Sequence, residues 1–207
     1  MLAEVLGALG ERRPAVRVIV LDICESPLML NRWYAGRAVR EIETLCSDIL
    51  ACPADGGFDA ICTHAFLSML PAAQRPALYA KWAQLLRPGG VVITVNRLRP
   101  AHAGAEVRFG ERDTAAYRAL VRERAASLPA GLGIDPDWLV SAAGRYAERL
   151  RVFPLHTSDE VAQGLECAGF RIAHISCAPI ASGAQDAVTA PTVPGGAQYL
   201  RVSAERR

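Results

Sequence analysis

The sequence is poor in lysine. Lys81 is the only lysine of the chain, and arginine supplies nearly all of its basic charge. The formal net charge is only +2 at pH 7, which is too balanced to indicate a nucleic acid or an anionic membrane as the partner. We interpret the preference for arginine as the coding bias of a GC-rich bacterium, and it points to no particular function.

Long apolar runs are also missing. No stretch reaches the roughly 18 apolar residues that indicate a transmembrane helix, and the chain does not open with the basic segment of a secretory signal. We therefore expect a cytoplasmic protein. Hydrophobic residues still make up 51% of the 207 positions, so the chain is long and apolar enough for one domain with a buried core.

A further absence concerns the six cysteines, none of which stands in a C-x-x-C pair. In a cytoplasmic chain this argues against a disulfide framework and against a zinc ribbon. We expect the cysteines to be small, buried apolar side chains. No phosphate-binding loop, no Ser/His/Asp arrangement and no metal-ligand spacing stands out either, so the sequence predicts no metal site.

The sequence does contain a regular alternation of helices and apolar strands. A helix is predicted over residues 2–9, and the apolar run 15–21, which ends at Asp22, is typical of a parallel strand buried on both faces. Ser26 as N-cap and Pro27 in the first turn predict a helix after it. Such alternation favours a doubly wound α/β fold with a mostly parallel sheet. Strands are also predicted at 42–46, 58–64 and 91–95, and a helix at 71–86 with an apolar stripe of Leu78, Trp82 and Leu85, ended by Arg87–Gly90.

Residues 97–154 separate two predicted strands by far more than one helix requires. Within them, 111–128 and 135–151 have helical patterns, and we interpret the segment as a helical cap inserted near the carboxyl edge of the sheet, in a single domain of residues 1–207. After it, Thr157 and Glu160 form a capping box, and the helix that they open ends at Gly169. The strands predicted at 170–180 and 197–204 are joined by a loop at 181–196 and form a hairpin, so the last strand is antiparallel.

Several features in this order resemble the class I S-adenosylmethionine-dependent methyltransferases. Asp22 follows one strand, Asp48 follows the next, and the segments FDAICTHAFLSMLP (58–71) and LLRPGGVVITV (85–95) come after them. The closing hairpin is a further similarity, and the resemblance covers roughly residues 1–96 and 155–203. It implies a Rossmann-like methyltransferase fold, S-adenosyl-L-methionine as the cofactor, and methyl transfer as the reaction.

The resemblance also implies a cofactor site at the carboxyl ends of the strands, where such sheets bind ligands. In the family, the acid that ends the second strand accepts hydrogen bonds from both ribose hydroxyls, which suits a carboxylate because it is only an acceptor. The acid after the third strand binds the adenine amino group, and the next residue packs on the ring. Structural alternatives are an acid favoured by a helix dipole for Asp22 and a turn residue for Asp48. The matching positions are Asp22, Ile23, Asp48 and Ile49, with Thr63, His64 and Ala65 beside the methionine part and its methyl group.

One part of the family pattern has no counterpart ahead of Asp22. It is the first strand with its glycine-rich loop, where glycine lets the backbone approach the cofactor. In the family this strand lies in the middle of the sheet, so its loss leaves two strand edges facing a gap, where each unpaired backbone group costs about 1 to 3 kcal/mol. We expect an N-terminally truncated methyltransferase, with Met1 an internal methionine or a misassigned start. The alternative is a natural variant that lost the loop and serves as a scaffold or partner subunit.

His64 is the candidate catalytic base, and the alternative is a hydrogen-bonded structural histidine at a strand end. Arg97 and Arg99 are candidates for holding an acceptor carboxylate through their guanidinium groups. The alternative for them, and for Arg108 and Arg112, is a solvated surface. Minor candidates for substrate contact are His102 and His156. We expect Tyr117 and Trp138 to form the interior of the cap. His174 is expected to be structural.

The sequence thus favours methyl transfer from S-adenosyl-L-methionine to a small-molecule acceptor, because a cap would enclose a small substrate. No nucleic acid, membrane or metal is expected as a partner. One alternative is the non-catalytic scaffold or partner subunit. Another is a nicotinamide-dependent oxidoreductase, since an acid after the second strand also suits that cofactor's ribose, but LLRPGG and the antiparallel last strand argue against it.

Overall fold

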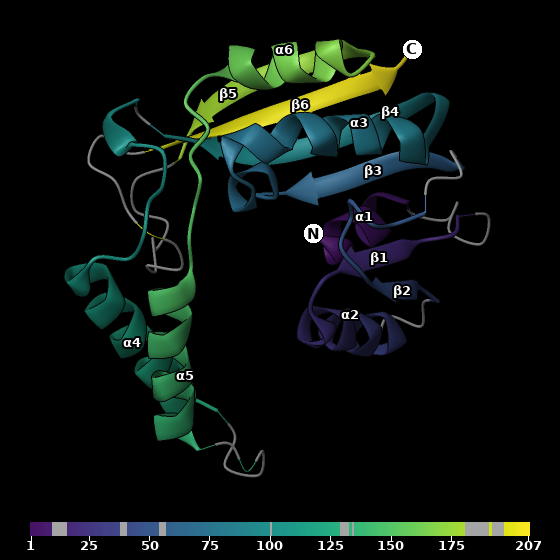
Figure 1. The fold of residues 1–207 in the computed structure, drawn as a ribbon. Coiled ribbons are helices and arrows are strands. Elements are labelled where there is room, and N and C mark those ends of the chain that lie inside the picture. The colour runs from purple at the N-terminus through teal and green to yellow at the C-terminus, as the bar shows by residue number, and fades with distance from the viewer. Residues whose placement is uncertain are drawn as a thin grey trace.

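The computed structural model describes residues 1–9, 16–37, 41–53, 57–99, 101–128, 133, 135–180, 191 and 197–207. Helices and strands alternate as the sequence predicts (Figure 1). Within the described ranges, no helix is both long enough and apolar enough to cross a membrane. The elements are α1 (Leu2–Leu9), β1 (Ile19–Asp22), α2 (Glu25–Arg37), β2 (Glu43–Cys46), β3 (Phe58–His64), η2 (Leu67–Met69), η3 (Ala72–Gln74), α3 (Arg75–Leu85), β4 (Leu86–Leu98), η4 (Ala101–Ala103), α4 (Glu111–Ala126), α5 (Pro136–Arg149), α6 (Ser158–Cys167), β5 (Phe170–Pro179) and β6 (Gln198–Arg206).

The strands of the described residues form two sheets. β1 pairs with β2 in parallel, and the larger sheet has the order β3-β4-β6-β5. In the larger sheet β3 and β4 are parallel, whereas β6 is antiparallel to both β4 and β5. The predicted antiparallel last strand is therefore confirmed. β1 and β3 each stand at the end of their sheet, and the break between the two sheets lies where the family pattern has its first strand.

The β1–β2 pair is less buried than its apolar sequence predicts. All of β1 is half-buried, and in β2 only Thr44 is half-buried while its other residues are exposed. Helix α2 packs against both strands, but no strand extends this sheet beyond β1 in the described part of the chain. The prediction of a first strand buried on both faces is therefore wrong.

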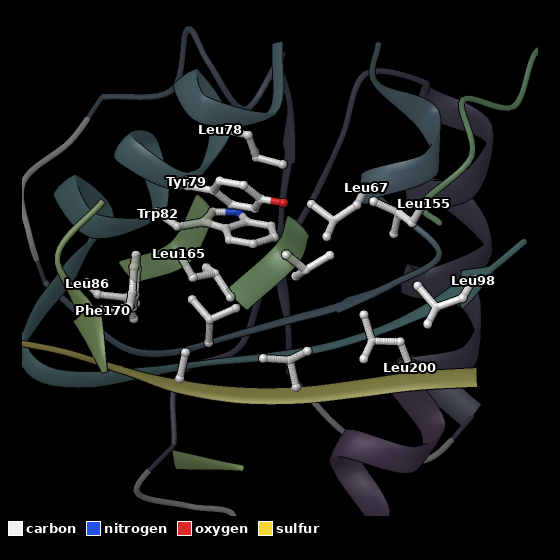
Figure 2. Packing of buried hydrophobic residues seen from close by; sticks show 14 residues of the cluster. Leu67, Leu78, Tyr79, Trp82, Leu86, Leu98, Leu155, Leu165, Phe170 and Leu200 are labelled. Carbon is white, nitrogen blue, oxygen red and sulfur yellow. The ribbon is translucent and has the colours of Figure 1, made fainter. Parts of the chain in front are cut away.

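The main hydrophobic core lies between the four-stranded sheet and the helices α3 and α6 (Figure 2). The predicted stripe of α3 is confirmed, because Leu78, Trp82 and Leu85 are all buried. Burying one such side chain stabilises the fold by about 1.5–3 kcal/mol, so this cluster accounts for much of the hydrophobic stabilisation. Its members are Leu67, Leu78, Tyr79, Trp82, Leu86, Val92, Leu98, Leu155, Val161, Leu165, Phe170, Leu200, Val202 and Ala204.

Helix α6 begins and ends as its sequence predicts. Thr157 is the N-cap, and its Oγ1 accepts a hydrogen bond from the Glu160 N–H at 3.2 Å. The Glu160 carboxylate accepts in turn from the backbone N–H of His156 at 2.9 Å. At the other end Gly169 has a φ of +89°, a left-handed conformation that glycine adopts without strain. The predicted N-cap Thr157 and the closing glycine are confirmed, whereas the carboxylate of Glu160 bonds one residue ahead of the N-cap N–H that a capping box uses.

The two helices of the predicted insertion are α4 and α5, which pack on one another. Figure 1 shows the pair extending away from the four-stranded sheet, so a capping role stays a prediction. Tyr117 lies between the rings of Phe109 and Tyr146, with centroid distances of 5.7 and 5.8 Å, which agrees with an interior role. Trp138 is 59% exposed, so the prediction is wrong for this residue. The buried residues of α5 are Val140, Ala143, Gly144 and Ala147.

The segment that returns from α5 is fastened to the core by Arg75. This side chain is buried, and its Nη2 donates hydrogen bonds to the backbone oxygens of Phe153 at 2.7 Å and Pro154 at 2.9 Å. Its Nε donates to the Leu67 oxygen at 3.3 Å, and Glu160 lies 3.7 Å from its Nη1. The C-terminal end of the predicted insertion is therefore anchored to α3.

Three local features differ from the prediction or lie outside it. Helix α2 begins at Glu25, so Ser26 lies inside the helix and is not its N-cap. Residues 87–90 do not separate helix from strand, because β4 already starts at Leu86 and its register with β3 shifts there. Within that segment a Cβ on Gly90 would lie 2.9 Å from the Arg87 oxygen, which explains why a residue without a side chain stands there.

The predicted loop 181–196 lies outside the described residues except for Pro191.

Candidate functional site

Asp22 is the last residue of β1, and its side chain closes a turn. Its Oδ1 accepts a hydrogen bond from the Cys24 N–H at 2.8 Å, just ahead of α2. Within the described ranges the other carboxylate oxygen has no hydrogen bond. The side chain is half-buried, and the following Ile23 is 69% exposed. Asp22 therefore retains an oxygen that can accept hydrogen bonds from a ligand.

Asp48 repeats this arrangement after β2. Its Oδ1 accepts a hydrogen bond from the Leu50 N–H at 2.9 Å, and the side chain is exposed. Ile49 is half-buried and packs against the main core, as does Leu50. The turn alternative considered from the sequence is thus present, but it uses only one of the two carboxylate oxygens.

The pairing of the two strands brings the acids to the same edge. Asp22 lies opposite Cys46 in the parallel register, and the Ser47 N–H donates to the Asp22 backbone oxygen at 3.0 Å. Asp48 is the next residue along. Two carboxylates therefore stand at the carboxyl edge of neighbouring parallel strands, which is where such folds bind ligands.

The end of β3 turns sharply after His64. Ala65 has a φ of +54°, which is uncommon for a residue other than glycine, and its N–H donates to the Val95 oxygen at 2.7 Å. Thr63 faces the sheet interior, where its Oγ1 donates to the Oγ1 of the buried Thr94 at 2.7 Å. Of these three predicted residues, only the His64 side chain is exposed.

Asn96 holds the loop after β3 in place, a role that is not among those predicted from the sequence. The Asn96 side chain is buried; its Oδ1 accepts from the Leu67 N–H at 3.2 Å, and its Nδ2 donates to Thr94 Oγ1 at 2.8 Å. Ser68 adds a bond from its Oγ to the Ala65 oxygen at 2.9 Å. The signal in the sequence is the presence of two polar residues, Thr94 and Asn96, on a face of β4 that otherwise carries Val92 and Leu98.

His64 lies beside Arg97 of β4 and Tyr199 of β6. The His64 and Tyr199 ring centroids are 6.5 Å apart, and the Arg97 guanidinium carbon lies 5.6 Å from the Tyr199 ring centroid. Partial burial lowers the pKa of His64, and the positive charges of the Met1 amino group and Arg97 lower it further. The imidazole is therefore neutral at pH 7, a state in which it can accept a proton.

Arg99 is buried, unlike the solvated arginine considered as its alternative. Its Nη1 donates to the Pro191 oxygen at 2.7 Å, and its backbone N–H donates to the Leu155 oxygen at 2.7 Å. The Nδ1 of His156 lies 3.1 Å from the Arg99 oxygen, so this ring nitrogen is the donor. His156 is half-buried. Its side chain links the segment that returns from α5 to the backbone of Arg99, whereas the Arg99 side chain bonds to Pro191.

The remaining candidates lie at the surface. Arg108 is exposed and pairs with Glu106, and Arg112 is exposed on α4, as the solvated alternative predicts. His102 is exposed on η4. His174 is exposed on β5, with its Nε2 3.1 Å from Ser176 Oγ.

Residues 3–90 match the family model of a methyltransferase domain. The matched segment contains both acids, His64 and the Ala65 turn. A comparison with curated protein sequences gives no match. The resemblance to the class I S-adenosylmethionine-dependent methyltransferases is thus confirmed for the part of the chain that holds the two acids.

The fold is also that of solved structures, and several of these are methyltransferases. The [4+2]-cyclase SpnF has 12% identity, a TM-score of 0.60, and coverage of 93% of this chain and 66% of its own. The 1,6-didemethyltoxoflavin-N1-methyltransferase of Burkholderia thailandensis, with bound 1,6-didemethyltoxoflavin and S-adenosylhomocysteine, has 16% identity, a TM-score of 0.55, and coverage of 92% and 61%. The geranyl diphosphate C-methyltransferase of Streptomyces coelicolor, with Mg²⁺, geranyl diphosphate and S-adenosylhomocysteine, has 14% identity, a TM-score of 0.56, and coverage of 97% and 66%.

These likenesses confirm the Rossmann-like α/β methyltransferase fold predicted from the sequence. Two of these structures contain S-adenosylhomocysteine, the demethylated form of the cofactor that the sequence resemblance implies. The chain spans only 53% to 66% of the length of several structures that it matches.

Proposed function

We propose that the protein transfers a methyl group from S-adenosylmethionine to a small-molecule acceptor. The observation that supports this most is the placement of Asp22 and Asp48 at one carboxyl edge, each with one oxygen engaged in a turn. A role in the turn accounts for the hydrogen bond of only one carboxylate oxygen in each acid. The second oxygens suit the O–H and N–H donors of an adenosyl group.

The donor chemistry of the edge fits the adenosyl half of the cofactor. Asp22 would accept from the ribose hydroxyls, with Ile23 beside it, and Asp48 would accept from the adenine amino group. Ile49 packs on the core, which would give the adenine ring a fixed apolar surface. The methionine half would lie against the end of β3, at Thr63, His64 and Ala65.

When bound, the cofactor supplies a methyl group on a positively charged sulfur, and the protein orients the partners. The buried Asn96 fixes the loop from Ala65 to Ser68 through Leu67. His64 is exposed and neutral at pH 7, so it can accept the proton of an acceptor that must lose one. An acceptor that needs no deprotonation would use His64 only as a wall of the site.

The small-molecule acceptor is supported by two of the similar structures, which contain 1,6-didemethyltoxoflavin and geranyl diphosphate. The acceptor of this chain, its cytoplasmic location and its bacterial origin stay predictions. SpnF, named as a cyclase, illustrates that this fold alone does not define a reaction. The non-catalytic scaffold or partner subunit therefore remains the second candidate.

Calorimetric binding of S-adenosylhomocysteine tests the proposal, with NADH as the competing ligand. The 207-residue chain is measured beside the same chain extended by any in-frame residues that precede Met1 in its gene. We expect S-adenosylhomocysteine to bind and NADH not to bind. Binding of NADH alone would support the oxidoreductase, and binding of neither ligand to either form would support the scaffold.

Asp22→Asn is the matching variant, because asparagine keeps one oxygen for the Cys24 N–H and loses the second acceptor. We expect at least a tenfold loss of S-adenosylhomocysteine affinity. Asp59→Asn is the control, since Asp59 lies at the opposite end of β3 and pairs only with the exposed Arg87 among the described residues. Equal affinities for the two variants would contradict the role of Asp22.

A further inference from the structure

Arg97 carries a positive charge that no acid compensates among the described residues. The side chain is half-buried on β4, opposite Tyr199 of β6 in the antiparallel register. Its guanidinium group stacks over the Tyr199 ring, with Nη2 3.5 Å from the Tyr199 hydroxyl. The described ion pairs involve other arginines, namely Arg17, Arg32, Arg75, Arg87, Arg108 and Arg171.

A second positive charge lies close to Arg97. Arg99 is buried and donates to the Pro191 oxygen, a neutral partner. Burial lowers the pKa of Arg99, and the charge of Arg97 lowers it further, which indicates that the two guanidinium groups repel each other. Two partly desolvated cations without an acid create a local field that favours an anion.

The neighbours of Arg97 suit an anion that belongs to a larger molecule. Tyr199 offers a hydroxyl donor near the guanidinium group, and its ring lies 6.5 Å from that of His64. A guanidinium fork binds carboxylate and phosphate oxygens in pairs. An anion at Arg97 would therefore have its molecule lying along Tyr199 toward His64.

We propose that Arg97 and Tyr199 form the anion-binding part of the acceptor site, so that the acceptor carries a carboxylate or phosphate group and lies beside His64. The identification of the ligand as a methyl acceptor rests on the proposed function. The anion site itself depends only on Arg97, Tyr199 and the absence of a described acid partner. The role of Tyr199 cannot be predicted from the sequence, because Tyr199 lies 102 residues from Arg97 along the chain.

Titration of the protein with matched aromatic probes tests the anion site. Sodium benzoate carries a carboxylate, phenyl phosphate carries a phosphate, and benzamide is their neutral counterpart. Binding is followed by NMR chemical-shift changes at low ionic strength. We expect one or both anions to bind at least tenfold more tightly than benzamide, and the stronger anion identifies the acceptor group. Equal affinities of benzamide and both anions would overturn the proposal.

Variants distinguish specific anion binding at Arg97 and Tyr199 from nonspecific attraction of anions to exposed arginines. Arg97→Ala is expected to weaken anion binding at least tenfold, and Tyr199→Phe about threefold because only the hydroxyl is lost. Arg112→Ala is the control, since Arg112 is exposed on α4, and its loss should leave anion binding unchanged. Arg97→Gln, which keeps most of the side-chain length, replaces Arg97→Ala if the latter does not fold. Equal weakening in the Arg97 and Arg112 variants would overturn the proposal.

The same wild-type sample titrated with S-adenosylhomocysteine distinguishes the two proposals. Cofactor binding without Arg97-dependent anion binding would overturn the anion site and leave methyl transfer supported. Arg97-dependent anion binding without cofactor binding would support the site and count against methyl transfer.

Discussion

Asn96 and Thr94 are joined by a hydrogen bond within the four-stranded sheet, in which Asn96 Nδ2 donates to Thr94 Oγ1 at 2.8 Å. The same Thr94 oxygen accepts from Thr63 of β3, and the Asn96 oxygen accepts from the Leu67 N–H. Both Thr94 and Asn96 are buried. A continuous polar chain therefore links two neighbouring strands to the loop that follows β3, and it fixes the position of His64 from inside the core.

Replacement of Asn96 by alanine should destabilise the protein. The Leu67 N–H would lose its partner in a site without solvent, and leaving a buried donor unpaired costs about 1 to 3 kcal/mol. We expect the free energy of unfolding, measured by urea denaturation, to fall by about 2 kcal/mol. Asn31→Ala is the control, because Asn31 lies half-buried on α2 and, among the residues that the structure describes, its side chain bonds only to the Pro27 oxygen of its own helix. Similar losses in the two variants would contradict this account of Asn96.

Two helical glycines should respond to alanine in opposite directions. A Cβ on Gly164 of α6 would lie 2.4 Å from Cε2 of Tyr79, whereas on Gly144 of α5 its nearest contact is Arg118 Cδ at 3.7 Å. Tyr79 is buried and cannot move aside, so Gly164→Ala should lower the unfolding free energy by about 1–3 kcal/mol. Gly144→Ala should raise it by about 0.5–1 kcal/mol through helix propensity.

Thermal unfolding followed by circular dichroism measures both glycine variants. Both variants replace a glycine by alanine in a helix interior. The difference between their changes in stability therefore reports the contact of residue 164 with Tyr79. The Tyr79→Phe background does not relieve the clash, since the approaching atoms belong to the ring. Stabilisation of the protein by Gly164→Ala would show that α6 and α3 are packed less tightly than described.

The cysteines are more exposed than the sequence predicts, and their exposure can be tested by alkylation. Cys24, Cys46, Cys167 and Cys177 are exposed, and only Cys52 is fully buried, so the expectation of six buried thiols is wrong for four of them. Burial raises the pKa of the half-buried Cys62, which reduces its reactive thiolate at a given pH. With iodoacetamide at pH 8, peptide mass spectrometry should find the exposed cysteines modified first. Early modification of Cys52 or Cys62 would contradict this order.

The alternation of helices and strands could be predicted because local patterns specify it. Thr157 and Glu160 are three residues apart, and Leu78, Trp82 and Leu85 recur at helical spacing, so each signal lies within a few turns of chain. The burial of β1 could not be predicted this way. An apolar strand indicates a covered face, but whether neighbours cover it depends on sheet order.

The residues of the candidate site likewise fall into two groups, those that the local sequence predicts and those that depend on distant partners. Asp22 and Asp48 could be predicted because each follows an apolar strand, and the carboxyl ends of parallel strands share an edge. The burial of Arg99 and the stacking of Arg97 on Tyr199 could not, because their partners lie 92 and 102 residues away in sequence. Arginine at a strand end is equally compatible with solvent and with a buried hydrogen bond until those partners are known.

His64 should titrate below the ordinary histidine pKa of about 6.5. Partial burial is the largest cause, and the Met1 amino group and Arg97 add to it. A histidine with a lower pKa in the folded than in the unfolded chain binds its proton less readily when folded. The stability that the neutral ring contributes is therefore fully present above the unfolded pKa, and it is lost as the pH falls from that value through the lower pKa of the folded protein.

An NMR titration of the His64 ring signal, assigned through its loss in His64→Gln, measures this pKa directly. Arg97→Ala should raise the pKa of His64 because it removes a nearby positive charge, whereas Arg112→Ala should leave the midpoint where it is. Unfolding measured between pH 5 and 8 should show a smaller loss of stability at acid pH in His64→Gln than in the wild type. A His64 midpoint at or above 6.5 in the folded protein would mean that an acid, not Arg97, faces the ring, and the anion site inferred at Arg97 would then already hold a partner.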